Sequence, residues 1–274
     1  MKSYRKELWF RVPEIIEVRL DGEAQKGVYP KDVILEVLGR IRADGAVYKA
    51  IDFTGSYVEK LNVAGRMTIC NMAVEMGAKT AYMQPNADVL NYVDKRAVRP
   101  YEVQFTDPDF QYEESYVFDV SKIEPNLACP SSVENVHPLS EVVANGPIKL
   151  NQGYIGSCTG GRVEDIAIAA KILKGRHIPE YTRLIVVPAS NEVMQECMKA
   201  GYIQDLMNAG ATITTPGCGA CLGILAPGEV CITSTNRNFP GRMGSTEALM
   251  YLASPATVAA SMVNGCITDP RDFL

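Results

Sequence analysis

The order of strand-like and helix-like segments constrains the fold of this 274-residue chain more than any other feature. Short runs rich in Val, Ile and aromatic residues alternate with longer amphipathic or Ala-rich runs along nearly its whole length. Strands that are joined by helices pair in parallel, and the helices cover the faces of the sheet. The sequence therefore predicts an α/β fold with mostly parallel sheets and flanking helices.

A loose stretch divides these segments into two groups. In the first group we expect strands over residues 14–22, 47–55 and 79–84, and helices over 31–42, 65–78 and 86–97. Asn86 is a residue type that caps helix N-termini. Prolines then interrupt the pattern between residues 99 and 130, although residues 112–122 alternate like a half-exposed strand. We expect two α/β domains, over residues 1–128 and 129–274.

The second group places three polar motifs directly after predicted strands. Here we expect strands over residues 148–155, 182–190, 211–215 and 229–235, and helices over 163–175, 190–210 (broken at Gly201) and 245–264. Cys158 follows the first strand, Cys218 and Cys221 follow the third, and residues 236–242 follow the fourth. Because ligands bind at the carboxyl ends of parallel strands, we expect the three motifs to gather at one edge of the sheet.

Composition and charge exclude several classes of function. A net charge of −5 argues against a nucleic-acid surface, which usually needs a basic stripe. The chain has no apolar run of the roughly 18–20 residues that cross a bilayer, and its first residues lack the apolar core of a signal peptide. Eight cysteines without a secretory signal favour reduced thiols in the cytoplasm. We therefore expect a cytoplasmic protein with no nucleic-acid or membrane partner.

Three of the cysteines have the spacing of a metal site. A C-x-x-C pair, Cys218 and Cys221, and a distant cysteine in a Gly-rich turn, Cys158, would leave one corner of a four-iron cluster open. An open position distinguishes catalytic metal sites from structural ones. A redox pair or a zinc site is the alternative, and zinc would need His137 or His177 as its fourth ligand. The other cysteines are expected to be small core residues.

Two groups of polar residues are candidates for binding or catalysis. Arg237 and Arg242 lie five residues apart in a Gly/Pro loop, and arginines in such a loop can grip carboxylates with two hydrogen bonds each. Asn71 and Glu75 are four residues apart and share a face of a largely apolar predicted helix. A buried glutamate is costly unless it is paired, which makes Glu75 a site candidate. The alternatives are ordinary surface arginines and a structural ion pair of Glu75 with Arg66.

Several segments taken together resemble the aconitase and isopropylmalate dehydratase family. They are WFRVPE, GVYPKDVILEVLGRI, GRMTICNMAVEMGA, GSCTGGRVED, PGCGACLG, TSTNRNFPGRMGS and YLASPATVAAS. The resemblance covers essentially the whole chain, and it implies an aconitase-like fold of the second and third domains of a large subunit. It also implies a [4Fe–4S] cluster that is bound by Cys158, Cys218 and Cys221.

The same resemblance assigns roles to the polar candidates. It implies that the free iron of the cluster acts as a Lewis acid, and that Arg237 and Arg242 hold substrate carboxylates. Asn71 and Asn236 would support the cluster, and Glu75 would hydrogen-bond the iron-bound water or hydroxyl. The expected activity is a hydro-lyase that dehydrates and rehydrates a 2-hydroxy di- or tricarboxylate. A 3-isopropylmalate dehydratase of leucine biosynthesis is favoured, with homoaconitase, dimethylmalate dehydratase or a non-catalytic metal-binding scaffold as alternatives.

The sequence also departs from the family pattern. It lacks the Asp-His and Asp-Ser-His-Thr stretches of the family's first domain and has no swivelling domain, which supplies a serine base. We therefore expect two complements, a small swivelling-domain subunit and the family's first domain, and no turnover of the small-molecule hydroxy acid without them. The first domain would be either a separate chain or a further part of the same protein. The segment CLGILAPGEVC is shorter than in relatives. An RNA-binding regulator, which the family includes, conflicts with the acidic charge.

Overall fold

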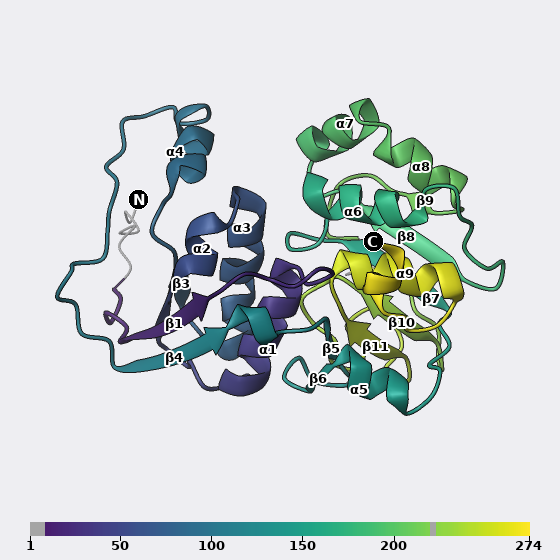
Figure 1. Cartoon of the computed structure of the whole chain (residues 1–274), viewed down its shortest axis with the longest axis horizontal. Coiled ribbons are helices and arrows are strands. Elements are labelled where there is room, and N and C mark those ends of the chain that lie inside the picture. The colour runs from purple at the N-terminus through teal and green to yellow at the C-terminus, as the bar shows by residue number, and fades with distance from the viewer. Residues whose placement is uncertain (1–8, 220–222) are drawn as a thin grey trace, which may run out of the picture.

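A computed structural model describes residues 9–219 and 223–274. Two sheets, each with its own helices, lie side by side, and helices α1 and α3 are on the side of the first half that faces the second (Figure 1). The alternation of strands and helices thus gives the α/β architecture that the sequence predicts. Within the described residues no helix is both long and apolar enough to cross a membrane.

The first half is built on a four-stranded sheet in the order β3-β2-β1-β4, in which all neighbouring strands are parallel. Its strands are β1 (Ile15–Asp21), β2 (Ala50–Thr54), β3 (Thr80–Tyr82) and β4 (Glu114–Asp119). Its helices are α1 (Pro30–Ile41), α2 (Ser56–Lys60), α3 (Val63–Met72) and α4 (Ala87–Asp94), with 3₁₀ turns η1 (Ala73–Met76) and η2 (Val120–Lys122). Alternate residues of β1, among them Ile16 and Val18, are buried in one core with α1. Each such fully buried aliphatic side chain stabilises the fold by about 1.5–3 kcal/mol.

The second half is built on a seven-stranded sheet in the order β6-β5-β11-β10-β7-β8-β9. Its strands are β5 (Asn126–Ala128), β6 (Val136–Pro138), β7 (Gln152–Gly156), β8 (Arg183–Val187), β9 (Thr212–Ile213), β10 (Val230–Thr233) and β11 (Leu249–Leu252). Its helices are α5 (Leu139–Ala144), α6 (Val163–Leu173), α7 (Asn191–Lys199), α8 (Tyr202–Asn208), α9 (Pro255–Asn264) and the 3₁₀ turn η4 (Pro270–Phe273). Strands β11 to β9 are parallel, and only β5 pairs antiparallel with its two neighbours. The prediction of mostly parallel sheets is confirmed.

Local sequence features explain where several elements begin and end. The side chain of Asn86 accepts a hydrogen bond from the N–H of Val89 at 3.1 Å, so it caps α4 as expected. The break at Gly201 is also confirmed, because α7 ends before this residue and α8 begins after it. The predicted helix over 65–78 begins with α3 but tightens into a 3₁₀ turn after Met72.

One prediction is wrong. Residues 245–264 were expected to be helical, but Leu249–Leu252 form β11, and the helix α9 begins only at Pro255. The strand lies between β10 and β5 in the sheet, so hydrogen bonds to two neighbours outweigh the local helical preference. The chain crosses from the first sheet to the second after β4. We propose that the two sheets are the centres of two domains divided close to residues 128 and 129.

The positive φ of Gly55 gives a test of the first half. Its φ is +100°, and an added Cβ would lie 2.3 Å from the carbonyl oxygen of Leu20. Gly55→Ala should therefore lose about 1–2 kcal/mol for the left-handed backbone and about 1–3 kcal/mol more for the clash. Gly146 is the matched control, because it has φ +109° and nothing within 4 Å of its Cβ position. Urea unfolding should show the smaller loss for Gly146→Ala, and equal losses would contradict the clash.

Candidate functional site

The three polar motifs lie at one edge of the seven-stranded sheet, as predicted. Strands β10, β7, β8 and β9 are consecutive and parallel, so their carboxyl ends point the same way. The Ser234 hydroxyl accepts a hydrogen bond from the N–H of Gly156 at 3.0 Å, which joins the loop after β10 to the turn after β7. The Tyr154 hydroxyl donates to the carbonyl oxygen of Cys218 at 2.8 Å, which joins β7 to the loop after β9.

The Cys158 turn can pack this closely only because of its glycines. A Cβ at Gly160 would lie 2.3 Å from the Ser234 hydroxyl oxygen, closer than real side chains approach. The turn leaves Cys158 exposed. The Nδ2 of Asn236 lies 3.9 Å from its Sγ, and the Thr159 hydroxyl bonds the Oδ1 of the same asparagine. Asn236 is therefore held beside the thiol from both ends of its amide.

The first half contributes Asn71 and Glu75 to the same place. The Nδ2 of Asn236 donates to the Oδ1 of Asn71 at 3.0 Å, and the Nε of Arg237 lies 2.9 Å from both carboxylate oxygens of Glu75. Asn236 and Arg237, which are consecutive in the second half, thus bond Asn71 and Glu75, which lie four residues apart in the first half. The Glu75 side chain is only 8% exposed, whereas that of Arg237 is 44% exposed. The Nη groups of Arg237 make no hydrogen bond to the described residues.

The alternative of an ion pair between Glu75 and Arg66 is wrong. The Arg66 guanidinium instead donates to the backbone carbonyls of Val58, Leu61 and Gln84, at 2.7, 3.0 and 2.8 Å. Arg66 therefore fastens α3 to the segments around it. A sequence cannot identify backbone carbonyls as partners of an arginine, because they carry no residue type.

The loop after β10 is anchored at its centre by Asn238, a buried residue. Its Nδ2 donates to the carbonyl oxygen of Cys129 at 2.8 Å and lies 3.3 Å from those of Ala128 and Met250. Arg242 is half-buried further along this loop, where its N–H donates to the carbonyl of Phe239 at 3.1 Å. The loop thus has a fixed course between the two predicted substrate arginines.

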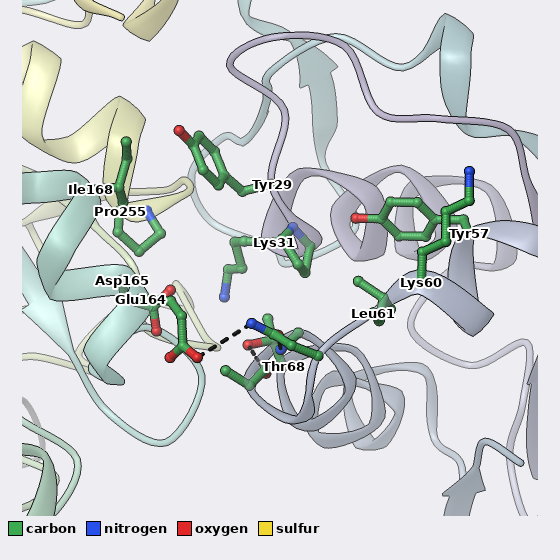
Figure 2. Close-up of a pocket in the computed structure, with 14 residues that line it drawn as sticks. Tyr29, Lys31, Tyr57, Lys60, Leu61, Thr68, Glu164, Asp165, Ile168 and Pro255 are labelled. Carbon is green, nitrogen blue, oxygen red and sulfur yellow. Dashed lines mark hydrogen bonds between the residues drawn. The ribbon is translucent and has the colours of Figure 1, made fainter. Parts of the chain in front are cut away.

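A cavity of about 320 Å³ lies between the two halves and was not predicted. Lys31 and Thr68 of the first half and Glu164 and Asp165 of the second line it, and an Asn62–Glu164 hydrogen bond crosses it (Figure 2). None of the site residues predicted from the sequence lines this cavity. Burial raises the pKa of Asp165 to about 7 and lowers that of Lys31 to about 8. One sequence feature would have identified Lys31, since a cation in the first turn of a helix opposes the helix dipole.

The cysteines differ in exposure in a way that fits a cluster site. Cys158 and Cys218 are exposed, whereas Cys197 and Cys231 are buried and the remaining described cysteines are half-buried. Thiolates are the usual ligands of iron–sulfur clusters, so the two exposed thiols at one sheet edge suit such a group. The third predicted ligand, Cys221, lies outside the described residues. Within the described part of the chain, no three His, Cys, Asp or Glu side chains are grouped to hold a metal ion.

Comparisons with known proteins show a family model that matches most of the chain and relatives that are named as large subunits of enzymes. A model of the aconitase family (aconitate hydratase) matches residues 4–265. The 3-isopropylmalate dehydratase large subunit 1 of Methanopyrus kandleri is 50% identical over 275 residues, which cover 98% of this chain and 64% of that protein. A probable methanogen homoaconitase large subunit of Methanothermobacter thermautotrophicus is 48% identical over 267 residues, 96% of this chain and 62% of that protein. The chain therefore spans less than two thirds of the length of these relatives.

A solved structure with a related name is also similar. The crystal structure of Thermococcus kodakaraensis aconitase X (holo-form) matches with a TM-score of 0.45 and 13% sequence identity. The match covers 86% of this chain and 54% of that one.

Alkylation of the folded chain tests the difference in exposure. Iodoacetamide should label Cys158 and Cys218 at least about tenfold faster than Cys197 and Cys231, because the thiolate reacts and must be reached by the reagent. Burial raises the pKa of Cys197 to about 11 and that of Cys231 to about 12. Mass spectrometry of timed digests gives the rates. In urea, where the chain is unfolded, all four cysteines should react at equal rates. Equal rates in the folded chain as well would contradict the burial of Cys197 and Cys231.

The raised pKa of Asp165 predicts a pH dependence of stability. A carboxyl group whose folded pKa lies near 7, above its ordinary 3.8, stabilises the fold at low pH and loses this contribution as the pH rises through 7. Asp165→Asn keeps an oxygen for the N–H of Arg162, which bonds this carboxylate at 3.0 Å. Between pH 5 and pH 8 the free energy of unfolding of the variant should fall by about 2–3 kcal/mol less than that of the wild type. Parallel urea-unfolding curves at both pH values would overturn the prediction.

Proposed function

The chain belongs to the aconitase family, and we propose from this that it is the part of a hydro-lyase large subunit that binds a [4Fe–4S] cluster and the substrate carboxylates. Membership of this family implies an iron–sulfur cluster. The proposed ligands are Cys158, Cys218 and Cys221. When bound, the cluster would supply a Lewis acid that polarises the hydroxyl group of the substrate.

One observation carries the proposal. Asn236 lies beside the Cys158 thiol and bonds Asn71, and the next residue, Arg237, bonds Glu75. A thiol, two amides, a guanidinium and a carboxylate are thus brought together from the two halves of the chain, although the residues of one half are far in sequence from those of the other. A purely structural contact between two halves has no need of an exposed thiol at its centre.

Each polar residue of the proposed site would have its own role in binding the substrate or the cluster. The Nη groups of Arg237 and the guanidinium of Arg242 would bind carboxylates of the substrate with paired hydrogen bonds. The Glu75 carboxylate would accept a hydrogen bond from the substrate hydroxyl or from the water that leaves and returns. Asn71 and Asn236, which bond one another at 3.0 Å, would support the cluster beside Cys158. Because these groups are held before substrate arrives, little ordering is left for the binding step.

We propose a 2-hydroxy di- or tricarboxylate as the substrate, with 3-isopropylmalate favoured. The relatives support a choice between 3-isopropylmalate dehydratase and homoaconitase, because both names occur at similar identity. Dimethylmalate would use the same groups. A retained scaffold without catalysis is the remaining alternative, and it predicts no cluster and no response to a dicarboxylate.

We propose two partners and a cytoplasmic location. The relatives are named large subunits, which supports a small subunit that carries the swivelling domain and its serine base. The chain spans about 64% of such a relative, which supports a further first-domain chain or segment. A cluster that is held by cysteine thiolates needs a compartment that keeps thiols reduced, as the cytoplasm does. No turnover is expected without both partners.

Serine substitution of single cysteines tests the cluster assignment. Cys158→Ser, Cys218→Ser or Cys221→Ser should remove most of the iron and sulfide that the purified chain takes up under anaerobic reconstitution, because thiolates hold the cluster. Cys129→Ser and Cys266→Ser, at half-buried sites, are the matched controls and should load as the wild type does. Iron and sulfide content and the electron paramagnetic resonance (EPR) spectrum after mild oxidation give the answer. A control variant that loses the cluster would mean that the ligands are assigned wrongly.

The activity itself is tested with the partners present. The reconstituted chain should interconvert the isomers of 3-isopropylmalate only when the small subunit and the first domain are added. Turnover by the chain alone would contradict the proposed division. Loading with zinc in place of iron and sulfide, with no response to a dicarboxylate, would favour the non-catalytic scaffold.

A further inference from the structure

We infer that Lys31 is a positioning residue for this site. Its ammonium holds Ser234 and Thr235, the two residues before Asn236, against the end of α3, where Asn71 lies. This inference rests on the proposed function, since it gives a role to Lys31 within the proposed site. Lys31 itself is not placed among the groups that touch substrate or cluster.

Lys31 is a fully buried cation at the junction of the two halves. Only 1% of the residue is exposed, although it lies in the first turn of α1. Its Nζ lies 2.7 Å from the carbonyl oxygen of Thr235, 3.3 Å from that of Ser234 and 3.0 Å from the Sδ of Met72. Figure 2 shows the ammonium directed between Asp165 and Thr68. All three hydrogen-bond acceptors are neutral, so no ion pair among the described residues accounts for the burial of this charge.

The acceptors explain why a donor is needed here. Ser234 and Thr235 come after the last residue of β10, so the regular pairing of the sheet has ended there, and both residues are buried. A buried carbonyl oxygen that accepts no hydrogen bond destabilises the fold, because it has lost its bonds to water. Among the described residues, only Lys31 donates to these two carbonyls. The ammonium therefore fixes the direction in which the chain leaves β10.

The same contacts connect the Cys158 turn, the loop after β10 and the end of α3 that carries Asn71. Ser234 also bonds the Cys158 turn through its hydroxyl, which lies 3.0 Å from the N–H of Gly156 and 3.3 Å from the carbonyl of Gly160. Met72 directly follows Asn71. Moving the Lys31 ammonium would thus shift the Asn71, Asn236 and Cys158 segments relative to one another. Asn236 and Arg237 also connect the loop after β10 to the α3 segment, but both are proposed site residues. Among the other described side chains, only that of Lys31 bonds both segments.

The electrostatic surroundings favour a charged lysine despite its burial. Burial lowers its pKa to about 8, while nearby acidic groups oppose the shift; these are Glu75, Asp165, Cys158 and Asp32. A buried charge is costly, and an apolar residue of similar size often stabilises a protein. The positioning role gives a physical reason for a lysine rather than an apolar residue at this position.

Hydrogen exchange in the metal-free chain tests the inference without any cluster. In Lys31→Met, the amides of Ser234 and Thr235 should exchange at least about tenfold faster relative to those of Ala169 and Ala170 in the interior of α6. In the wild type the N–H of Ser234 donates to the carbonyl oxygen of Tyr154 at 3.0 Å, and that of Thr235 donates to the Thr233 hydroxyl at 3.1 Å. Lys60→Met is the matched control, because Lys60 lines the same cavity but is exposed and pairs with Glu23. Exchange of the Ser234 and Thr235 amides that matches the wild type, or an equal rise throughout the chain, would overturn the inference. Should Lys31→Met fail to fold, Lys31→Gln carries the same comparison.

The reconstituted chain separates this inference from the proposed function. Lys31→Met should retain the iron content of the wild type, while 3-isopropylmalate shifts its EPR signal with at least about tenfold weaker affinity. Failure of the wild-type chain to bind a cluster would count against the proposed function, and the exchange data would still decide the role of Lys31. Unchanged affinity in Lys31→Met, with a loaded cluster, would overturn the positioning role.

Rescue by a small amine distinguishes the ammonium from the space that it fills. The cavity of about 320 Å³ gives access to the position of Lys31. In Lys31→Ala, n-butylamine should slow the exchange of the Ser234 and Thr235 amides toward the wild-type rate, and n-butanol at the same concentration should not. Equal slowing by the alcohol would show that filled volume is sufficient, which would overturn the inference.

Discussion

Two opposite charges are buried next to one another in the first turn of α1, and the arrangement of both halves depends on how they are satisfied. Lys31 donates to the carbonyls of Ser234 and Thr235 after β10. Asp32 accepts from the N–H of Tyr29, which begins α1, and from the N–H of Asn126, which begins β5. Isolated buried charges are too costly to persist, so these bonds must all be made together. One turn of helix thereby connects the first half to two strands of the second sheet.

The proposed site follows from this connection and from the direction of the strands. Parallel strands deliver the Cys158 turn, the Cys218 loop and the loop after β10 to one edge, and no local sequence preference is needed for this. The first half then adds Asn71 and Glu75 through α3 and the turn that follows it. Helix α3 packs against α1, so the residue that joins the halves and the residues that face the thiol belong to one packed unit.

The sequence predicted what depends on periodicity and on local chemistry. The alternating segments predicted the parallel sheets. The residue types at Asn86 and Gly201 predicted a helix cap and a helix break. The four-residue spacing predicted that Asn71 and Glu75 face the same side. The features that the sequence did not predict have a different origin. Strand β11 exists because two neighbours pair with it, and the partner of Glu75 comes from 162 positions away. Lys31 bonds backbone carbonyls, which every residue type has. Each of these depends on contacts that form only when the chain is folded.

The ion pair between Glu75 and Arg237 shows how such contacts would serve the proposed chemistry. The Glu75 carboxylate is nearly buried and accepts hydrogen bonds from the Nε of Arg237. The Nη nitrogens of Arg237 make no hydrogen bond to the described residues. A buried carboxylate without this partner would be costly, so the pair holds Glu75 in one orientation before any ligand binds. In the proposed function a substrate carboxylate would then bind the outer nitrogens without displacing Glu75. Because the two residues come from different halves, such binding at Arg237 would also stabilise the arrangement of the halves that Lys31 is inferred to maintain.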